Sequence, residues 1–160
     1  ADEVWKFTGH DDSVHEQTYY DVNEAFNNPE IEKKMESLVD IKKDLLKALE
    51  LKRKDKEIGT SIDSSVFIYV KDENLRKSLN ASPEDVRRFF QVSKVTVTDT
   101  PVEGMATYDV SSVKVEKATG KKCVRCWNYY DSLGKDPNHP ELCDRCTDAV
   151  HTVEKQGANA

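Results

Sequence analysis

The sequence has few apolar residues and no long run of them. Only 37% of its 160 residues are apolar, whereas 34% are charged, and no window approaches the ~18 consecutive apolar residues of a membrane helix. The first residues carry acidic side chains and lead into no apolar segment, so they do not form a secretory signal. These absences predict a cytoplasmic chain with no membrane partner. Because it starts at Ala1, we expect it to be a fragment of a longer protein.

Motifs that would support catalysis are also missing. The sequence contains no glycine-rich phosphate loop, no paired-histidine metal motif and no Ser-His-Asp order. We therefore expect that this chain alone is not an enzyme.

Acidic residues are unevenly distributed along the chain. Residues 1–30 hold eight acids and one lysine, a net charge of −7, so the other 130 residues contribute +1 to the total of −6. Two basic stretches stand out. Lys42–Lys56 has seven bases and three acids, and Ser112–Cys126 has five bases and one acid. Such stretches suit nucleic-acid phosphates, but charge runs are more often solvated surface.

Apolar residues recur every three or four positions over residues 30–58, which predicts one long amphipathic helix. The apolar stripe consists of Ile31, Met35, Leu38, Ile41, Leu45 and Leu49. Gly59 follows directly, and glycine commonly ends a helix in the left-handed conformation. We therefore expect the helix to stop near Glu57.

Beyond Gly59 the pattern changes to short strands and helices. We expect strands at Val66–Val70, Lys94–Thr98 and Ser111–Lys117, and helices at Asp72–Leu79 and from Ser82 through Phe90. The predicted class is α+β, with a long N-terminal helix leading into a small mixed α/β domain. The predicted organisation is an acidic connecting segment at 1–29, the helix at 30–58, a small α+β domain at 59–118, and a metal-binding module with a C-terminal tail at 119–160.

All four cysteines lie in the last quarter of the chain, as Cys123, Cys126, Cys143 and Cys146. The spacing C-x2-C-x16-C-x2-C is typical of a structural zinc site, in which four thiolates surround one ion. Four thiolates leave no open coordination position, so we expect one structural Zn²⁺ and no catalysis by zinc-bound water.

Two other uses of these cysteines are less favoured. Disulfides require an oxidising compartment, and a redox Cys-x-x-Cys requires one pair at a strand-to-helix turn. His139 and His151 could replace a thiolate, but the paired cysteine spacing favours cysteine ligands only.

Cations and aromatic residues surround the cysteines. The positive charges of the lysines and arginines would balance a zinc–thiolate cluster of formal charge −2. The aromatic rings could pack over the zinc loop. The same combination suits single-stranded RNA, whose bases stack on aromatic rings. The candidate RNA-binding residues are Lys121, Lys122, Arg125, Trp127 and Arg145, with Lys52 and Arg53 from the first basic stretch.

Gly120–Trp127 and Leu142–Cys146 together resemble the C-terminal zinc finger of bacterial isoleucyl-tRNA synthetase. The resemblance extends upstream to Leu46–Glu50 and Lys56–Ile62. It also includes Ala1–Trp5 and Ser13–His15, which look like the end of the family's anticodon-binding helical bundle, so the resemblance implies that residues 1–29 lead out of that bundle. Val124 departs from the family, in which proline is frequent at this position of the first cysteine pair.

The resemblance implies a parent enzyme that uses ATP to join isoleucine to tRNA(Ile). Its ATP and isoleucine sites belong to a catalytic domain whose His-Ile-Gly-His and Lys-Met-Ser-Lys-Ser signatures are absent from this chain. The implied role is a tRNA-binding C-terminal appendage that contacts the anticodon side of tRNA(Ile) and the remainder of the synthetase chain.

The alternative is a free-standing, zinc-dependent adaptor domain that binds protein. An adaptor predicts an exposed apolar patch and no salt-dependent binding of RNA.

Overall fold

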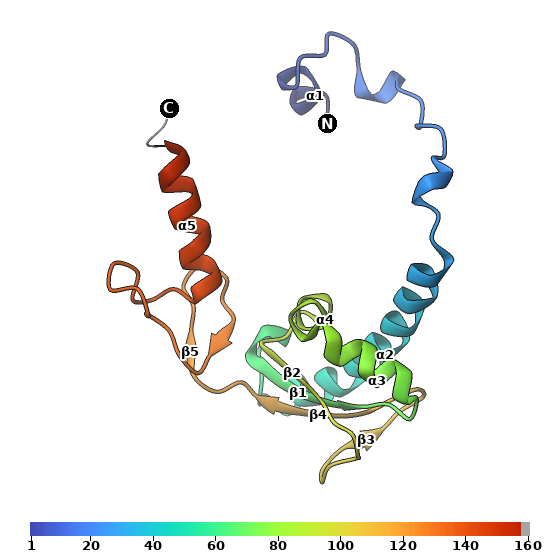
Figure 1. Cartoon of the computed structure of the whole chain (residues 1–160), viewed down its shortest axis with the longest axis vertical. Coiled ribbons are helices and arrows are strands. Elements are labelled where there is room, and N and C mark those ends of the chain that lie inside the picture. The colour runs from blue at the N-terminus through green and yellow to red at the C-terminus, as the bar shows by residue number, and fades with distance from the viewer. Residues whose placement is uncertain (158–160) are drawn as a thin grey trace. The chain divides into compact units, whose positions relative to one another are not determined.

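Residues Ala1–Met35 form the first of two structural units in a computed structural model that describes residues 1–157 (Figure 1). Residues 158–160 of the predicted tail lie outside the described residues. The unit contains α1 (Asp2–Phe7), the 3-10 helices η1 (Val14–Glu16) and η2 (Glu24–Phe26), and the start of α2 (Pro29–Lys54).

Local hydrogen bonds hold the beginning of this unit together. The Ser13 hydroxyl donates to the Asp2 carboxylate at 2.9 Å, and the Trp5 indole donates to Asp12 at 2.9 Å. No residue of Ala1–Met35 is buried. The unit therefore has no hydrophobic core of its own. The residue pattern alone did not predict its helix α1 or its two 3-10 helices.

The long helix α2 leads into the second unit, which begins at Glu36. Its predicted stripe is buried from Leu38 through Leu49, whereas Ile31 is 59% exposed. The stripe thus contributes to a core only in the part of α2 that belongs to the second unit.

The prediction that Gly59 ends this helix is wrong. Lys56 adopts the left-handed conformation, with a φ of 58°. The backbone N–H of Glu57 donates to the Lys52 carbonyl, and that of Lys56 donates to the Arg53 carbonyl, both at 3.0 Å. These two bonds form a Schellman motif, which satisfies the last carbonyls of α2 without glycine.

A four-stranded sheet follows the 3-10 helix η3 (Ser61–Asp63). Its strands are β1 (Ser64–Tyr69), β2 (Lys94–Val97), β3 (Ala106–Thr107) and β4 (Ser112–Lys117), in the order β2-β1-β4-β3. β1 and β2 are parallel, and the crossover between them contains α3 (Glu73–Ala81) and α4 (Pro83–Phe90). The other pairs are antiparallel. The predicted α+β class is confirmed, with one short strand more than expected.

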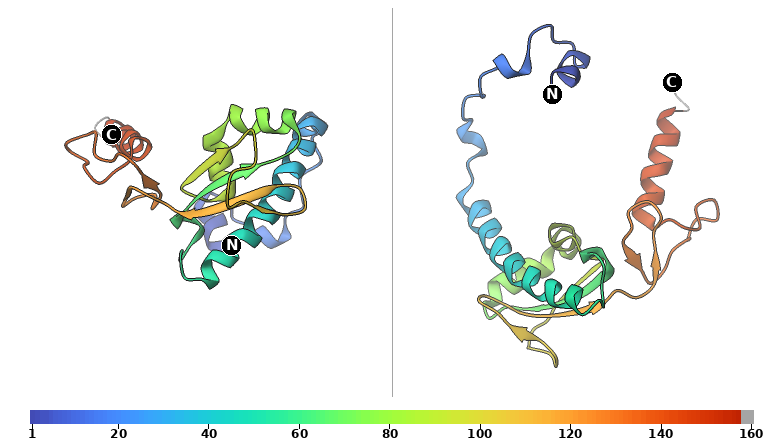
Figure 2. Two further views of the ribbon diagram at one scale, coloured as in Figure 1. Left: turned by 90° about the horizontal axis from the view of Figure 1, so that it is seen from below. Right: turned by 180° about the vertical axis from the view of Figure 1, so that it is seen from behind.

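The core of this domain lies on one face of the sheet. Val66 and Ile68 of β1 pair with Val115 and Val113 of β4, and all four are buried. Figures 1 and 2 show α2, α3 and α4 on the same side of the sheet, and their apolar residues complete the core. Alternating burial along β1 is what a sheet covered on one face requires.

A second, smaller cluster lies in the C-terminal module, which contains β5 (Lys121–Lys122), β6 (Tyr129–Tyr130) and α5 (Asp144–Gly157). Its buried members are three of the cysteines, with Leu133 and Leu142 packed against them. Since the two cores share no residue, the module depends on its cysteines for its own stability. Within residues 1–157, no helix has the length and apolar character needed to cross a membrane.

Candidate zinc centre and adjoining basic groove

The first cysteine pair lies in the turn that joins β5 to β6. The N–H of Trp127 donates to the Cys123 carbonyl at 2.8 Å, and the N–H of Cys123 donates to the Asn128 carbonyl at 3.0 Å. Gly120 precedes the turn with a φ of 89°, and a Cβ there would lie 2.2 Å from the Tyr130 carbonyl oxygen. Only glycine therefore allows the two strands to approach this closely.

The second pair lies at the start of α5. The N–H groups of Cys146 and Thr147 donate to the Cys143 carbonyl at 2.9 and 3.0 Å, so Cys143 opens the helix and Cys146 lies in its first turn. The N-terminus of a helix carries a partial positive charge, which favours thiolates at this position.

The four sulfur atoms converge, as the spacing predicted. All four Sγ atoms lie within 4.8 Å of one another, and the Sγ atoms of Cys126 and Cys143 are 3.8 Å apart. A regular tetrahedron with Zn–S bonds of ~2.3 Å has S–S edges of about 3.8 Å. All four cysteines are free thiols rather than disulfides. The donor set therefore fits one tetrahedral zinc ion with no open position.

The protein environment shifts the pKa values of two of the thiols in opposite directions. Burial acts to raise the pKa of Cys126, but hydrogen bonds from the backbone and side chain of Asn128 outweigh it and bring this pKa to about 6. Burial raises the pKa of the Cys143 thiol to about 12. A bound cation would supply the charge that Cys143 needs to ionise. Burial also raises the pKa of Tyr130, whose hydroxyl lies 3.8 Å from the Cys126 sulfur.

Two of the candidate RNA-binding residues contact the cysteine cluster. Arg125 Nη1 lies 3.8 Å from the Cys146 sulfur. Arg145 hydrogen-bonds to Cys126, which raises the pKa of the guanidinium. Two arginines offset the formal charge of −2 that four thiolates and one Zn²⁺ would carry.

The other candidates from this region lie away from the sulfurs. Lys122 Nζ is 3.9 Å from Asp63 and 5.6 Å from the centre of the Tyr129 ring. Trp127 is 62% exposed, so most of its surface is not packed on the zinc loop. Lys121 is also exposed.

A groove with a cavity volume of 550 Å³ joins the two basic stretches. Arg53 and Lys56 from the end of α2 line it together with Lys117 from the end of β4 and the ring of Tyr129. We call these four residues the basic groove. Glu57 and Asp63 also line it, and each carboxylate is bridged to a lysine: Lys52 at 2.9 Å and Lys122 at 3.9 Å. Sequence reasoning named Lys52 and Arg53 individually and included Lys56 and Lys117 only as members of the two basic stretches. It could not foresee that the fold brings these lysines together with Tyr129.

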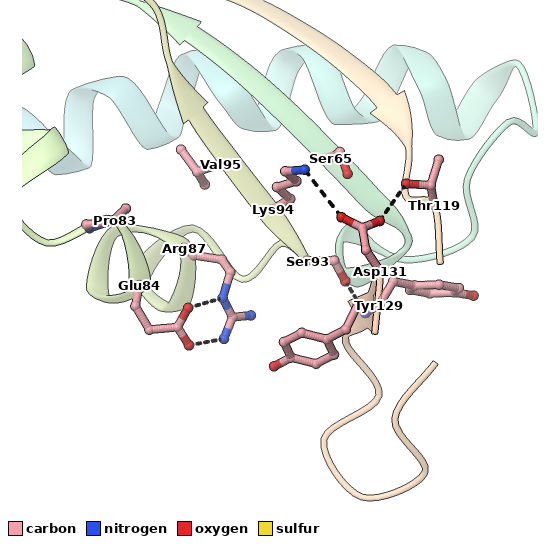
Figure 3. Close-up of a pocket in the computed structure, with 11 residues that line it drawn as sticks. Ser65, Pro83, Glu84, Arg87, Ser93, Lys94, Val95, Thr119, Tyr129 and Asp131 are labelled. Atoms are coloured by element: carbon pink, nitrogen blue, oxygen red, sulfur yellow. Dashed lines mark hydrogen bonds and ion pairs between the residues drawn. The ribbon is translucent and has the colours of Figure 1, made fainter. Parts of the chain in front are cut away.

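A second cleft, of 320 Å³, lies between α4, β2 and β6 (Figure 3). Arg87, buried in α4, is held by two hydrogen bonds to Glu84 at 2.8 and 2.6 Å and donates to the Asn128 side chain at 2.8 Å. The Ser93 hydroxyl accepts from the Tyr129 N–H at 2.8 Å. These contacts attach the cysteine module to the α/β domain.

Sequence reasoning missed Arg87 and Ser93. The available signal was Glu84 three residues before Arg87, which predicts a helical ion pair but not the burial of the arginine.

Comparisons with known proteins agree with this geometry. A family model described as a zinc finger found in FPG and IleRS matches residues 120–149, which include all four cysteines. The chain is 38% identical to the isoleucine–tRNA ligase of Brachyspira hyodysenteriae over 94% of its own length and 16% of the relative. It is 35% identical to the ligase of Syntrophotalea carbinolica over 91% of this chain and 16% of the relative. It is 34% identical to the ligase of Natranaerobius thermophilus over 97% of this chain and 18% of the relative.

The chain thus spans about one-sixth of the length of the curated relatives it matches. Those relatives carry the name isoleucine–tRNA ligase, and the matched part contains the cysteine module together with the α/β domain that supports it. The comparisons confirm the resemblance read from the sequence: this chain corresponds to the C-terminal zinc-finger region of isoleucine–tRNA ligases.

Proposed function

We propose that this chain is the tRNA-binding C-terminal appendage of an isoleucine–tRNA ligase. The observation that carries the proposal is the basic groove, in which two basic stretches about sixty residues apart in sequence line one cavity with an aromatic ring. Cations in a groove neutralise backbone phosphates, and an aromatic ring there can stack on an unpaired base.

The groove offers the charges that a nucleic-acid backbone requires. Its two carboxylates are each bridged to a lysine at the margin of the groove, which reduces their repulsion of phosphate. Arg125 and Arg145 act differently, because they neutralise the cysteine cluster. We therefore assign the phosphate contacts to the basic groove, with Lys52 and Lys122 beside it. Exposed Lys121 on the same strand as Lys122 is a further candidate, and base stacking by exposed Trp127 is a separate hypothesis.

The parent enzyme, in this proposal, joins isoleucine to tRNA(Ile) with ATP in a separate catalytic domain in the cytoplasm. This chain would contribute contacts to the anticodon side of the tRNA, and one structural Zn²⁺ would complete the fold of the module. Isoleucine-dependent pyrophosphate exchange by the pure chain should stay at background. Turnover that survives repurification would contradict the proposal.

The remainder of the synthetase is the second proposed partner. The exposed aromatic residues of the first unit support it, because Phe7, Tyr19, Tyr20 and Phe26 are all at least 85% exposed and the unit has no core. Hydrogen exchange of residues 1–35 should be fast in the isolated chain and slower in the full-length ligase. Equal exchange rates in both would exclude this contact.

The test of RNA binding is a salt titration with tRNA(Ile) and a noncognate tRNA. If the basic groove contacts phosphates, log affinity falls linearly with log salt, and the Lys56→Ala/Lys117→Ala variant lowers the magnitude of the slope by about 0.7–0.9 for each lost contact. Lys121→Ala/Lys122→Ala tests whether the lysines of β5 also contact phosphates. If the Trp127 ring stacks on a base, Trp127→Ala should weaken RNA binding by about 1–3 kcal/mol with little change in the salt slope.

The control is Lys71→Ala/Lys77→Ala, which removes two exposed lysines outside the groove. Each variant is first shown to retain zinc. An unchanged affinity and slope for Lys56→Ala/Lys117→Ala would refute the assignment of the groove. Salt-independent behaviour of the wild type, with no RNA binding, would favour the protein-binding adaptor.

A further inference from the structure

A second cluster of metal-binding side chains lies in the same module, outside the four cysteines. Its members are Asp136 and His139 from the loop between the cysteine pairs, and His151 from α5. We propose that these three residues bind a divalent first-row transition-metal ion, with the carboxylate of Glu154 next to His139. The proposal is independent of RNA binding.

The geometry brings the donors together from two segments. His151 Nε2 lies 2.9 Å from Asp136 Oδ2, and His139 Nε2 lies 3.8 Å from Glu154 Oε1. One ligand atom from each of Asp136, His139 and His151 falls within 4.8 Å of the others. A tetrahedral ion with bonds of ~2.0–2.1 Å needs ligand separations of about 3.3 Å. The observed separations bracket this value.

Both segments present their donors at a spacing of three residues. His151 and Glu154 are one helical turn apart on α5, so they lie on the same face. In the loop, the N–H of His139 donates to the Asp136 carbonyl at 3.1 Å, which closes a turn that places both side chains on one side. The N–H of Asn138 donates to Asp136 Oδ1 at 2.8 Å and thereby orients the other carboxylate oxygen toward His151. This is the type of support that metal-binding carboxylates commonly have.

The donor set selects the class of ion. Two imidazoles and one or two carboxylates suit Zn²⁺, Ni²⁺ or Cu²⁺, whereas Mg²⁺ and Ca²⁺ prefer oxygen donors. Asp136 and His139 are largely buried, but Glu154 is 59% exposed, so the site is reachable from solvent. Binding of the metal ion would link the loop that contains Asp136 and His139 to α5.

The competing explanation is a hydrogen-bonded His151–Asp136 pair that only fastens the loop. It predicts no second metal ion. The two explanations differ in stoichiometry, because the four cysteines can hold only one ion.

The experiment uses the full 160-residue chain, loaded with zinc at the cysteines and desalted until metal analysis gives one equivalent. Calorimetric titration with Zn²⁺ should then show one further equivalent. The NMR imidazole signals of His139 and His151 should shift on binding, whereas those of His10 and His15 stay in place as internal references.

His139→Gln/His151→Gln should weaken the second binding event by more than about 10-fold, a loss that even changes in supporting residues can cause. The first equivalent and the circular dichroism spectrum should be unchanged. Asp136→Asn provides a second variant that preserves the size of the side chain, and His15→Gln is the matched control. A wild-type chain that binds no second equivalent, or a double variant that binds it as tightly as the wild type, would overturn the proposal.

Discussion

Asp44 carries a buried charge that joins α2 to the turn before β4. Its carboxylate accepts hydrogen bonds from the N–H of Val110 at 2.9 Å and from the N–H and hydroxyl of Ser111, both at 3.0 Å. Only 1% of the residue is exposed. A buried carboxylate is tolerated when several donors satisfy it, and its loss leaves those donors unpaired.

We predict that Asp44→Asn lowers the free energy of unfolding by about 1.5–3 kcal/mol. An amide nitrogen would replace the oxygen that faces the Asp109 N–H at 3.4 Å and the Lys47 ammonium at 3.5 Å, and the bonds to the other oxygen would lose their charge. Urea denaturation of the zinc-loaded chain measures the change. Asp40→Asn, at an exposed position of the same helix, is the control and should change stability by less than about 0.5 kcal/mol. Similar effects of the two substitutions would contradict this account.

The same carboxylate predicts a pH dependence. Burial acts to raise the pKa of Asp44, but the hydrogen bonds from Val110 and Ser111 outweigh it and lower the pKa below its ordinary value of 3.8. The contribution to stability is therefore complete above about pH 4 and is lost as pH falls through the lowered pKa. Stability measured at amides of β1 and β4 should fall less steeply below pH 4 in Asp44→Asn than in the wild type.

The structural roles of some residues could be predicted from the sequence, whereas those of others could not. The convergence of the four cysteines was predictable, because two short spacings impose it through local turns. The roles of Asp44 and Arg87 were not, because each acts through partners more than forty residues away in sequence. Nothing in the local pattern distinguishes these two charged residues from the solvated charges around them.

At the scale of elements, α2 and α4 end in the same way. Gln91 after α4 has a φ of 58°, as Lys56 has after α2, and neither is glycine. The sequence predicted the existence of both helices, because apolar periodicity and the Ser82-Pro83 start signal are local. The end of α2 was misplaced because hydrogen bonding in the turn, rather than glycine, fixed it.

We predict that Gln91→Gly raises the free energy of unfolding by about 0.5–1 kcal/mol, because glycine adopts the left-handed conformation without a steric cost. Gln91 is exposed, so the substitution removes no core contact. Lys77→Gly in the exposed part of α3 is the control and should lower stability by about 1 kcal/mol. Thermal unfolding compares the two, and a loss of stability in Gln91→Gly would contradict the prediction.

For the whole molecule, the separation of the two cores predicts the effect of removing zinc. Structural zinc contributes an apparent ~10–16 kcal/mol in finger peptides, more than the small core of the module can replace. Chelation, or Cys143→Ser, should therefore unfold residues 119–157 and leave the sheet and α2 folded. The α/β domain would lose the contact between Arg87 and Asn128, but Arg87 keeps its two hydrogen bonds to Glu84.

Hydrogen exchange resolved by residue measures this outcome, with re-addition of zinc as the control. Amides of α5 should lose protection in the metal-free chain and regain it with zinc, while amides of β1 keep theirs. Protection of α5 without zinc would show that the module does not need the ion, and simultaneous loss of protection in β1 would show that the two cores are not independent.

The strand order of the sheet has a consequence for partial chains. β1 lies in the interior of the sheet, yet its antiparallel partner β4 begins at Ser112, more than forty residues after β1 ends. In a chain that stops before Ser112, β1 would expose one row of unpaired backbone groups beside Val66 and Ile68. An open, apolar strand edge is a template for intermolecular pairing. Truncation within the linker before β4 should therefore yield an aggregating protein, whereas truncation after Lys117 leaves every strand of the sheet present.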